Sequence, residues 1–187
     1  MTNSSYPVAR ISRFLSRWGA ILLLLPLLIA GGCKSSRIKF PDHGTSGPTF
    51  EVNINDENLS ESRRRILREC HDWLGTPYQY AGYEKGVGAD CSGMVLSVYL
   101  DATGIKLPRN SAKQAEFCKH IKKSAVKPGD LVFFATGSDP DRISHVGIMI
   151  DNVRFIHSSS SKGVCISDVT TPYYTRTFKM YGRVPGL

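Results

Sequence analysis

One cysteine and two histidines have the residue types and local settings of a nucleophilic site. Cys91 stands where a loop rich in Gly and Tyr, residues 75–89, gives way to an apolar helical pattern. A helix N-terminus presents free N–H groups and about half a positive charge, which favours the reactive thiolate. His145 and His157 lie in strand-like segments. A cysteine, a base and a third group that orients the base would form a catalytic triad.

Each of these residues also has a structural interpretation. A free cysteine is often a buried core residue, and each histidine could be a satisfied structural side chain. The surrounding sequence favours chemistry, because Asp-Cys-Ser-Gly opens the predicted helix at residues 90–93 and Ser-His-Val-Gly opens a strand at residues 144–147.

The turn between the two histidine-bearing segments limits how they can meet. Segments 145–150 and 153–157 are joined at Asp151-Asn152. A strict two-residue turn there would place the two histidines on opposite faces of the sheet. For both to face Cys91, the connection must be a three-residue loop or contain a bulge, and we predict one of these.

Helices followed by consecutive strands must position these groups. The patterns predict helices over about 60–75, 90–104 and 110–119, each beginning at a residue that caps helices. The predicted strands are Asp130–Ala135, His145–Ile150, Val153–His157 and Phe178–Val184. This order predicts an α+β fold with N-terminal helices packed on an antiparallel sheet.

The first 32 residues have the pattern of an export signal. Residues 18–30 form an apolar run of 13 that Pro26 interrupts, whereas a membrane span needs about 20 residues. Ala30-Gly31-Gly32-Cys33 then resembles a bacterial lipobox, with Ala30 where leucine is usual. The resemblance implies that Cys33 is acylated and anchors the chain in a membrane. The alternative is an ordinary secretory signal with a coincidental cysteine.

The rest of the chain divides into a tether and a domain. Residues 33–58 are rich in Ser, Gly, Pro, Asn and Asp, which predicts a flexible tether after the acylated Cys33. Residues 59–187 predict a single domain. Lys34, rather than aspartate, resembles a signal that permits outer-membrane transport. We therefore expect a lipid-anchored protein of the cell envelope, on the outer membrane facing the periplasm if the bacterium has two membranes.

Six segments in order resemble the NlpC family of bacterial cell-wall cysteine peptidases, especially its small single-domain lipoproteins. They are Trp73–Gly82, Asp90–Gly93, Leu107–Gln114, Lys127–Phe134, Ser144–Ile148 and Phe155–Ser161. The resemblance covers about residues 61–184. It implies a papain-like cysteine peptidase core that cleaves peptidoglycan stem peptides without a cofactor.

The resemblance also implies roles for single residues. The catalytic cysteine falls on Cys91, the base on His145 and the third polar residue on His157. The family's active-site tyrosine, from a Tyr-x-x-Gly-Gly stretch, falls on Tyr78, and Ala81 replaces the first glycine of that stretch. We expect the backbone N–H of Cys91 and the hydroxyl of Tyr78 to stabilise the oxyanion of the reaction.

Three polar neighbours are candidates for substrate binding. Asp90 and Ser92 flank the nucleophile, and relatives suggest that such residues bind a free amine of the substrate. The alternative role of Asp90 is to cap the helix. Arg109 is expected either to reach a carboxylate of the stem peptide or to be a surface or structural arginine.

The remaining cysteines lie in a chain that we expect to reach an oxidising compartment. One pair among Cys70, Cys118 and Cys165 could form a disulfide, but Cys70 and Cys118 lie on apolar helix faces, so we expect buried free thiols. No Cys or His spacing supports a metal site, and we expect none. Tyr173 and Tyr174 fall in a predicted loop, either lining the groove or as plain surface residues.

Composition and charge limit the partners. The 187 residues carry a formal net charge of +8, but no arginine-rich helix or zinc-finger spacing supports nucleic-acid binding. We expect a monomer that contacts stem peptides and, through Cys33, a membrane.

Two bonds are candidates for cleavage: the γ-D-glutamyl–diamino-acid bond within a stem and the D-alanyl–diamino-acid cross-link between stems. The resemblance to small lipoproteins favours the cross-link. Two alternatives stay open. One is an amidase or acyltransferase on the same Cys–His core. The other is a lipid-anchored, non-catalytic module that binds peptidoglycan.

Overall fold

The computed structural model describes residues 56–187. The predicted signal peptide, Cys33 and the tether up to residue 55 lie outside the described residues. At the end of the predicted tether, the carbonyl of Asp56 accepts hydrogen bonds from the N–H of Leu59 and from the side chain of Arg64. Between residues 56 and 187, no helix has the length and apolar character to cross a membrane.

Helices come first along the described chain and most of the strands follow. The helices are α1 (Glu61–Asp72), α2 (Cys91–Thr103), α3 (Ser111–Phe117) and α4 (Pro172–Thr177), with a 3-10 turn η1 at Lys123–Ala125. The strands are β1 (Tyr83–Glu84), β2 (Gly88–Ala89), β3 (Lys119–Ile121), β4 (Leu131–Phe134), β5 (His145–Met149), β6 (Arg154–Ser159), β7 (Gly163–Asp168) and β8 (Phe178–Arg183).

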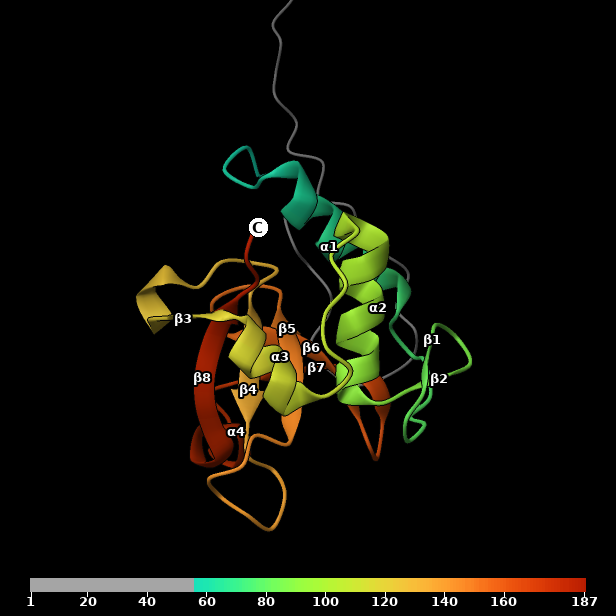
Figure 1. Ribbon diagram of the computed structural model, residues 1–187, viewed down its shortest axis with the longest axis vertical. Coiled ribbons are helices and arrows are strands. Elements are labelled where there is room, and N and C mark those ends of the chain that lie inside the picture. Colours follow the sequence, from blue (N-terminus) through green and yellow to red (C-terminus); the bar gives the residue numbers. More distant parts are fainter. Residues whose placement is uncertain (1–55) are drawn as a thin grey trace, which may run out of the picture. The chain divides into compact units, whose positions relative to one another are not determined.

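The main sheet is antiparallel and has the strand order β3-β8-β4-β5-β6-β7. Figure 1 shows α1 and α2 side by side next to this sheet, and α2 contacts both β5 and β6. Strands β1 and β2 form a separate hairpin before α2. This arrangement confirms the predicted α+β fold with N-terminal helices packed on an antiparallel sheet.

Apolar side chains alternate along the central strands, so both faces of the sheet bury residues. Leu131 and Phe133 of β4 belong to the large core that α1 and α2 complete. Val132 and Phe134 belong to a smaller cluster on the other face. The two-residue period that separates these clusters also decides on which face each active-site candidate on a strand lies.

The link between β5 and β6 is a three-residue connection, as one of the two predicted forms requires. Ile148 pairs with Ile156 and Met149 with Phe155, and the N–H of Ile150 donates to the carbonyl of Arg154 at 2.9 Å. Residues 151–153 therefore form the loop. Since side chains two residues apart share a face, this register places His145 and His157 on the same face as Met149 and Phe155.

Predicted and observed elements differ at several points. The first two helices are confirmed, whereas the third ends at Phe117 rather than near residue 119, because residues 119–121 leave the helix to pair with β8. The four predicted strands are confirmed, but β1, β2, β3 and β7 were not predicted. The predicted loop around Tyr173 and Tyr174 is wrong, because Pro172 opens the short helix α4. Proline favours the first turn of a helix, where its missing N–H has no helical partner.

Candidate active site

Cys91 is the first residue of α2, and the residues around it explain the Asp-Cys-Ser-Gly sequence. Asp90 caps the helix by accepting a hydrogen bond from the N–H of Gly93 at 2.7 Å. Gly93 packs so tightly against the carbonyl of Gly82 that a Cβ at this position would clash with it. The capped end therefore holds the Cys91 thiol at a helix N-terminus, as predicted.

Two grooves meet at Cys91 and Tyr78, which line both of them. The arginine groove, of about 750 Å³, is also lined by Tyr80, Asp90, Ser92, Arg109 and the segment 137–139. The histidine groove, of about 530 Å³, is also lined by His145, His157, the turn at 158–162 and Tyr174. The structure thus brings Cys91, His145, His157 and Tyr78 to one groove, and Asp90, Ser92 and Arg109 to the other.

A chain of hydrogen bonds runs from His145 into the protein. His145 Nε2 lies 2.9 Å from His157 Nδ1. His157 Nε2 lies 3.0 Å from the hydroxyl of Ser167 and 3.2 Å from that of Tyr174. The His157 ring is 1% exposed, and it packs 4.9 Å from the ring centroid of Phe155. Apolar packing and hydrogen bonds together fix the orientation of this ring.

This network is consistent with a specific pair of tautomers. Burial lowers the pKa of His145 to about 4 and, with the charge of His145, holds the pKa of His157 well below its usual value, so both rings are neutral at pH 7. If His145 carries its proton on Nε2 and donates to His157 Nδ1, then its Nδ1 is an unprotonated base. His157 then carries its proton on Nε2, next to two hydroxyls that can accept it.

The protonation state of Cys91 differs from the prediction. Burial, followed by the charge of Asp90, raises the pKa of its thiol to about 11, against the opposing effect of the Val146 and Ser92 N–H groups. The helix N-terminus was predicted to favour a thiolate, but the loss of hydration at this site outweighs that field. At neutral pH the groove therefore holds the Cys91 thiol together with the neutral imidazole of His145.

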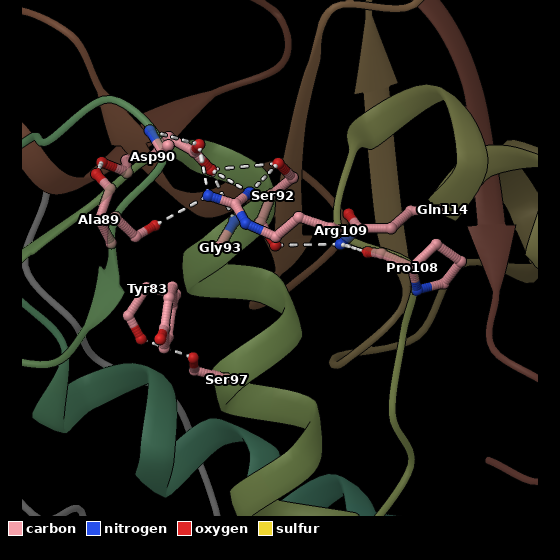
Figure 2. Close-up of polar contacts among 12 residues, drawn as sticks. Tyr83, Ala89, Asp90, Ser92, Gly93, Ser97, Pro108, Arg109 and Gln114 are labelled. Carbon is pink, nitrogen blue, oxygen red and sulfur yellow. Dashed lines mark hydrogen bonds and ion pairs between the residues drawn. The ribbon is translucent and has the colours of Figure 1, made fainter.

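Arg109 forms a clamp across the helix cap (Figure 2). Its guanidinium lies 2.8 Å from Asp90 Oδ2, 3.0 Å from Asp90 Oδ1 and 3.0 Å from the hydroxyl of Ser92. Burial raises the pKa of Asp90, but Arg109 and the N–H of Gly93 outweigh it and hold that pKa below its usual value. Both carboxylate oxygens of Asp90 are thus engaged, and Ser92 is buried behind them. A substrate amine would have to compete with Arg109 for this carboxylate.

The Leu107–Gln114 segment holds the clamp in place. Gln114 is fully buried and donates through Nε2 to the carbonyls of Ser92 and Pro108 at 3.0 and 2.9 Å, as Figure 2 shows. Asn110 caps α3 by accepting from the N–H of Lys113 at 2.9 Å. This segment therefore ties α3 to the start of α2 and places Arg109 over Asp90.

Tyr78 lies at the mouth of both grooves and is 38% exposed. Burial, followed by the charges of Cys91 and Asp90, raises its pKa. Its phenol therefore keeps its proton at neutral pH. A protonated hydroxyl beside the nucleophile is able to donate a hydrogen bond to a developing oxyanion.

Ala81 adopts a backbone conformation that suits glycine. Its φ is +60°, and it is the single non-glycine residue of the described part of the chain with a positive φ. Its N–H donates to Asp90 Oδ2 at 3.1 Å, which holds the loop against the cap. The glycine that the NlpC-like pattern places at this position is thus the residue that fits this backbone without strain.

Replacing Ala81 with glycine is expected to stabilise the protein by about 1 kcal/mol, because it relieves the left-handed strain at a Cβ. The measurement is the urea midpoint at constant m-value. The matched control is Ala125→Gly, at an exposed alanine in η1 without a positive φ, which is expected to be destabilising. If Ala81→Gly and Ala125→Gly destabilised the protein equally, the backbone at Ala81 would not be strained.

The two buried histidines predict a loss of stability in mildly acidic solution. The pKa of His145 falls from 6.5 to about 4 on folding, so between these pH values the unfolded chain binds more protons than the folded chain. The free energy of unfolding should therefore decrease as the pH falls through this window, by roughly 3 kcal/mol for this ring. Asp90 and Asp151, whose folded pKa values lie below 3.8, lose their contributions only at lower pH.

Chemical denaturation between pH 7 and pH 4 measures this slope. His145→Gln should flatten this slope. An unchanged slope in His145→Gln would contradict the neutral, buried ring.

Tyr173 and Tyr174 line the histidine groove, which confirms one of the two predicted alternatives, but sequence reasoning missed Ser167 and the contact of Tyr174 with His157. Ser167 lies on β7 and Tyr174 on α4, neither of which was predicted. Their signal was weak, because a short polar strand and a proline-led turn resemble a loop. Cys165 is paired with His157 across β6 and β7, and its sulfur lies 3.8 Å from His157 Nε2.

The four cysteines of residues 56–187 are all free. Cys70 and Cys118 are free thiols, as expected. Cys70 is fully buried, whereas Cys118 is only partly buried. Among the described side chains, no group of three or more His, Cys, Asp and Glu is arranged to hold a metal ion.

Comparison with known proteins identifies relatives. A sequence model of the NlpC/P60 family matches residues 75–183. "Probable endopeptidase NlpC" of Escherichia coli (strain K12) is 36% identical over 164 residues, 87% of this chain and 97% of that protein. "Murein DD-endopeptidase MepS/Murein LD-carboxypeptidase" of the same strain is 38% identical over 131 residues, 68% of each chain.

Solved structures agree with the sequence matches. A protein of the NLP/P60 family, described as similar to lipoprotein, from Staphylococcus aureus is 30% identical, with a TM-score of 0.61. The match covers 67% of this chain and 42% of that one, so this chain spans less than half of that protein.

Proposed function

The chain belongs to the NlpC/P60 family, and on that premise we propose that Cys91, His145 and His157 are the catalytic residues with which it hydrolyses peptidoglycan. The protein is a murein endopeptidase-like hydrolase with an α+β, papain-like fold. The observation that carries the assignment of residues is the 2.9 Å contact from His145 to His157 in a groove that Cys91 also lines.

The reaction begins with proton transfer from the Cys91 thiol to Nδ1 of His145. As the proton leaves, the sulfur attacks the amide carbon and the carbonyl π electrons move to oxygen. The backbone N–H of Cys91 and the hydroxyl of Tyr78 donate to this oxyanion, each contributing about 3 kcal/mol to transition-state stabilisation. His157 holds the imidazole and stabilises the imidazolium that forms.

The intermediate then collapses and the carbon–nitrogen bond breaks. His145 gives its proton to the departing amine, and the acyl half stays on Cys91 as a thioester. Water next loses a proton to His145 and attacks the thioester carbon. The carbon–sulfur bond breaks, the acyl half leaves as a carboxylic acid, and the proton returns to the Cys91 sulfur.

We place the acyl half of the substrate in the arginine groove, because the departing amine must face His145. Arg109 then lies on the acyl side. Its four terminal N–H groups donate to Asp90, Ser92 and the carbonyl of Gly82, and its Nε–H is proposed to bind a stem-peptide carboxylate. Asp90 and Ser92 support Arg109 and the helix cap in this scheme. The cap role of Asp90 is thus favoured over binding of a free amine.

The ion pair of Asp90 with Arg109 helps to decide which of the two candidate bonds is cleaved. A site that requires a free substrate amine near the nucleophile needs an available carboxylate, and this one is paired with Arg109 at 2.8 Å. We therefore propose cleavage of the D-alanyl–diamino-acid cross-link rather than of the γ-D-glutamyl bond. The E. coli relative named as a DD-endopeptidase supports this choice.

We also propose that residues 1–32 are a lipoprotein signal peptide, that Cys33 is acylated and that residues 33–58 tether the domain at 59–187. The Ala-Gly-Gly-Cys sequence after the apolar run supports this. The protein then acts in the cell envelope as a lipid-anchored monomer, on the outer membrane if the bacterium has two membranes.

The test incubates the full-length protein in detergent with purified cross-linked peptidoglycan and follows the products by mass spectrometry. Conversion of cross-linked dimers to intact monomers supports cross-link cleavage, and shortened stems instead identify cleavage of the γ-D-glutamyl bond. Removal of the stem from the glycan would identify an amidase. Binding without any product would favour a non-catalytic module and contradict the proposal.

A further inference from the structure

Resting on the proposed hydrolysis, we infer that Lys162 forms a carboxylate-binding site in the histidine groove, which selects a diamino acid with a free carboxylate on the carbon that carries the cleaved amine. This residue lies in none of the segments that resemble the NlpC family. Lys162 would bind the amine-side half of the substrate, whereas Arg109 is proposed to bind the acyl half.

The direction of the substrate follows from the catalytic proton. The departing amine must take its proton from His145, so the amine-side residue lies over the groove that His145 lines. Cys91 and Tyr78 line both grooves, so the acyl half extends the other way. In either of the two candidate bonds, the amine-side residue is the diamino acid.

The histidine groove has a single fixed charge on its amine-side wall. Among its lining residues in the described chain, Lys162 is the one Lys, Arg, Asp or Glu side chain. The others carry no fixed charge: the two histidines, serine, threonine and tyrosine hydroxyls, and the thiols of Cys91 and Cys165. A polar wall with one ammonium group is complementary to one anionic group of a ligand.

Lys162 is also available for binding. It lies in the turn between β6 and β7 and is exposed, and no ion pair joins it to an acidic residue of the described chain. Other lysines near acids are paired, such as Lys85 with Glu69 at 2.6 Å.

The charge of Lys162 affects the pKa values of two other residues of the groove. Burial lowers the pKa of His157, and the charges of His145 and Lys162 lower it further. Burial raises the pKa of Cys165, and Lys162 opposes that shift. Lys162 lines the same groove as Cys91, His145 and His157, so its ammonium group shares the space that we assign to the amine-side residue.

The position of the carboxylate distinguishes the possible substrates. In a cross-link to a diamino acid that bears a carboxylate at each end, the cleaved amine and a free carboxylate share one carbon atom. In a cross-link to lysine, the carbon that bears the cleaved amine carries no carboxylate. A cation in this groove therefore favours the diamino acid with a free carboxylate at the cleaved end. It disfavours both lysine and the same diamino acid with that carboxylate amidated.

The experiment compares two synthetic cross-linked peptides that differ only at this group, one with the free carboxylate and one with the carboxamide. The full-length protein, Lys162→Met, Lys162→Arg and Lys162→Glu are assayed for kcat and KM on both. Lys123→Met is the matched control, because Lys123 is an exposed lysine in η1 that lines neither groove.

The readout is the ratio of kcat/KM for the acid to that for the amide. Lys162→Met is expected to lower this ratio about fivefold, mainly through KM for the acid, as for an exposed ion pair. Lys162→Glu should lower it about 20-fold, since repulsion replaces attraction. Lys162→Arg and Lys123→Met should leave the ratio near that of the unmodified protein.

An unchanged ratio in Lys162→Met and Lys162→Glu, with both peptides cleaved by the unmodified protein, would overturn the carboxylate site and leave the proposed hydrolysis intact. Failure of the unmodified protein to cleave either peptide would overturn the proposed hydrolysis of cross-links, and the inference with it.

Discussion

Replacing Cys91 with alanine should lower kcat for stem-peptide cleavage by at least about 10⁴-fold, because it removes the thiol that we propose as the nucleophile. The removed sulfur is partly buried at the capped start of α2. Alanine is a good helix former, so the fold should be retained. The measurement is the release of monomers from cross-linked dimers, with circular dichroism to verify folding.

The matched control is Cys165→Ala, since this residue is the second thiol that lines the histidine groove. Its sulfur lies 3.8 Å from His157 Nε2, but Cys165 lies within strand β7, whereas Cys91 is the first residue of a helix. Cys165→Ala should retain most of the activity. A greater loss in Cys165→Ala than in Cys91→Ala would contradict the assignment of the nucleophile.

Replacing His145 with alanine should lower kcat by about 10³- to 10⁴-fold, within the range of general acid–base catalysis. The thiol pKa of about 11 explains why the effect is so large. Without a base, very little thiolate exists at pH 7, and the departing amine has no proton donor. KM should change little, because His145 acts on protons rather than on substrate binding.

Two further variants distinguish the base from its positioning residue. His157→Ala should cost about 10²-fold in kcat, whereas His157→Asn should retain more activity, because its side-chain oxygen can accept from His145 Nε2. His120→Ala, at an exposed histidine, is the control. A loss of less than tenfold in His145→Ala would contradict its role as the base.

Local sequence was sufficient to predict the parts of the site that local rules determine. Asp90 caps α2 and places Cys91 at its N-terminus, and capping is a property of neighbouring residues. Parity required either a three-residue loop or a bulge between β5 and β6 if the two histidines, 12 residues apart, were to share a face, and the structure has the loop.

The inner half of the site depends on contacts between distant residues and was not predictable in this way. Ser167 reaches His157 only because β7 pairs with β6, and Tyr174 only because α4 folds back against Phe134 and Phe155. The pKa of Cys91 is another case. The helix terminus is visible in the sequence, but the burial that opposes it arises from tertiary packing.

The clamp of Arg109 on Asp90 was predictable only in part from the sequence. The sequence indicated both residues as binding candidates but not their contact, since 19 residues separate them. Their pairing favours the cap role of Asp90, which is one of the two predicted alternatives, over the binding of a substrate amine. On this ground we propose cleavage of the cross-link rather than of the γ-D-glutamyl bond.

We propose that Cys91 carries the acyl half of a stem peptide as a thioester. To test this, the full-length protein is quenched in acid during turnover of a cross-linked peptide and mapped by mass spectrometry. We expect a mass increase equal to the acyl half on the peptide that contains Cys91, absent in Cys91→Ala. An adduct on Cys165 or on the serines at 158–161, or continued cleavage by Cys91→Ala, would contradict it.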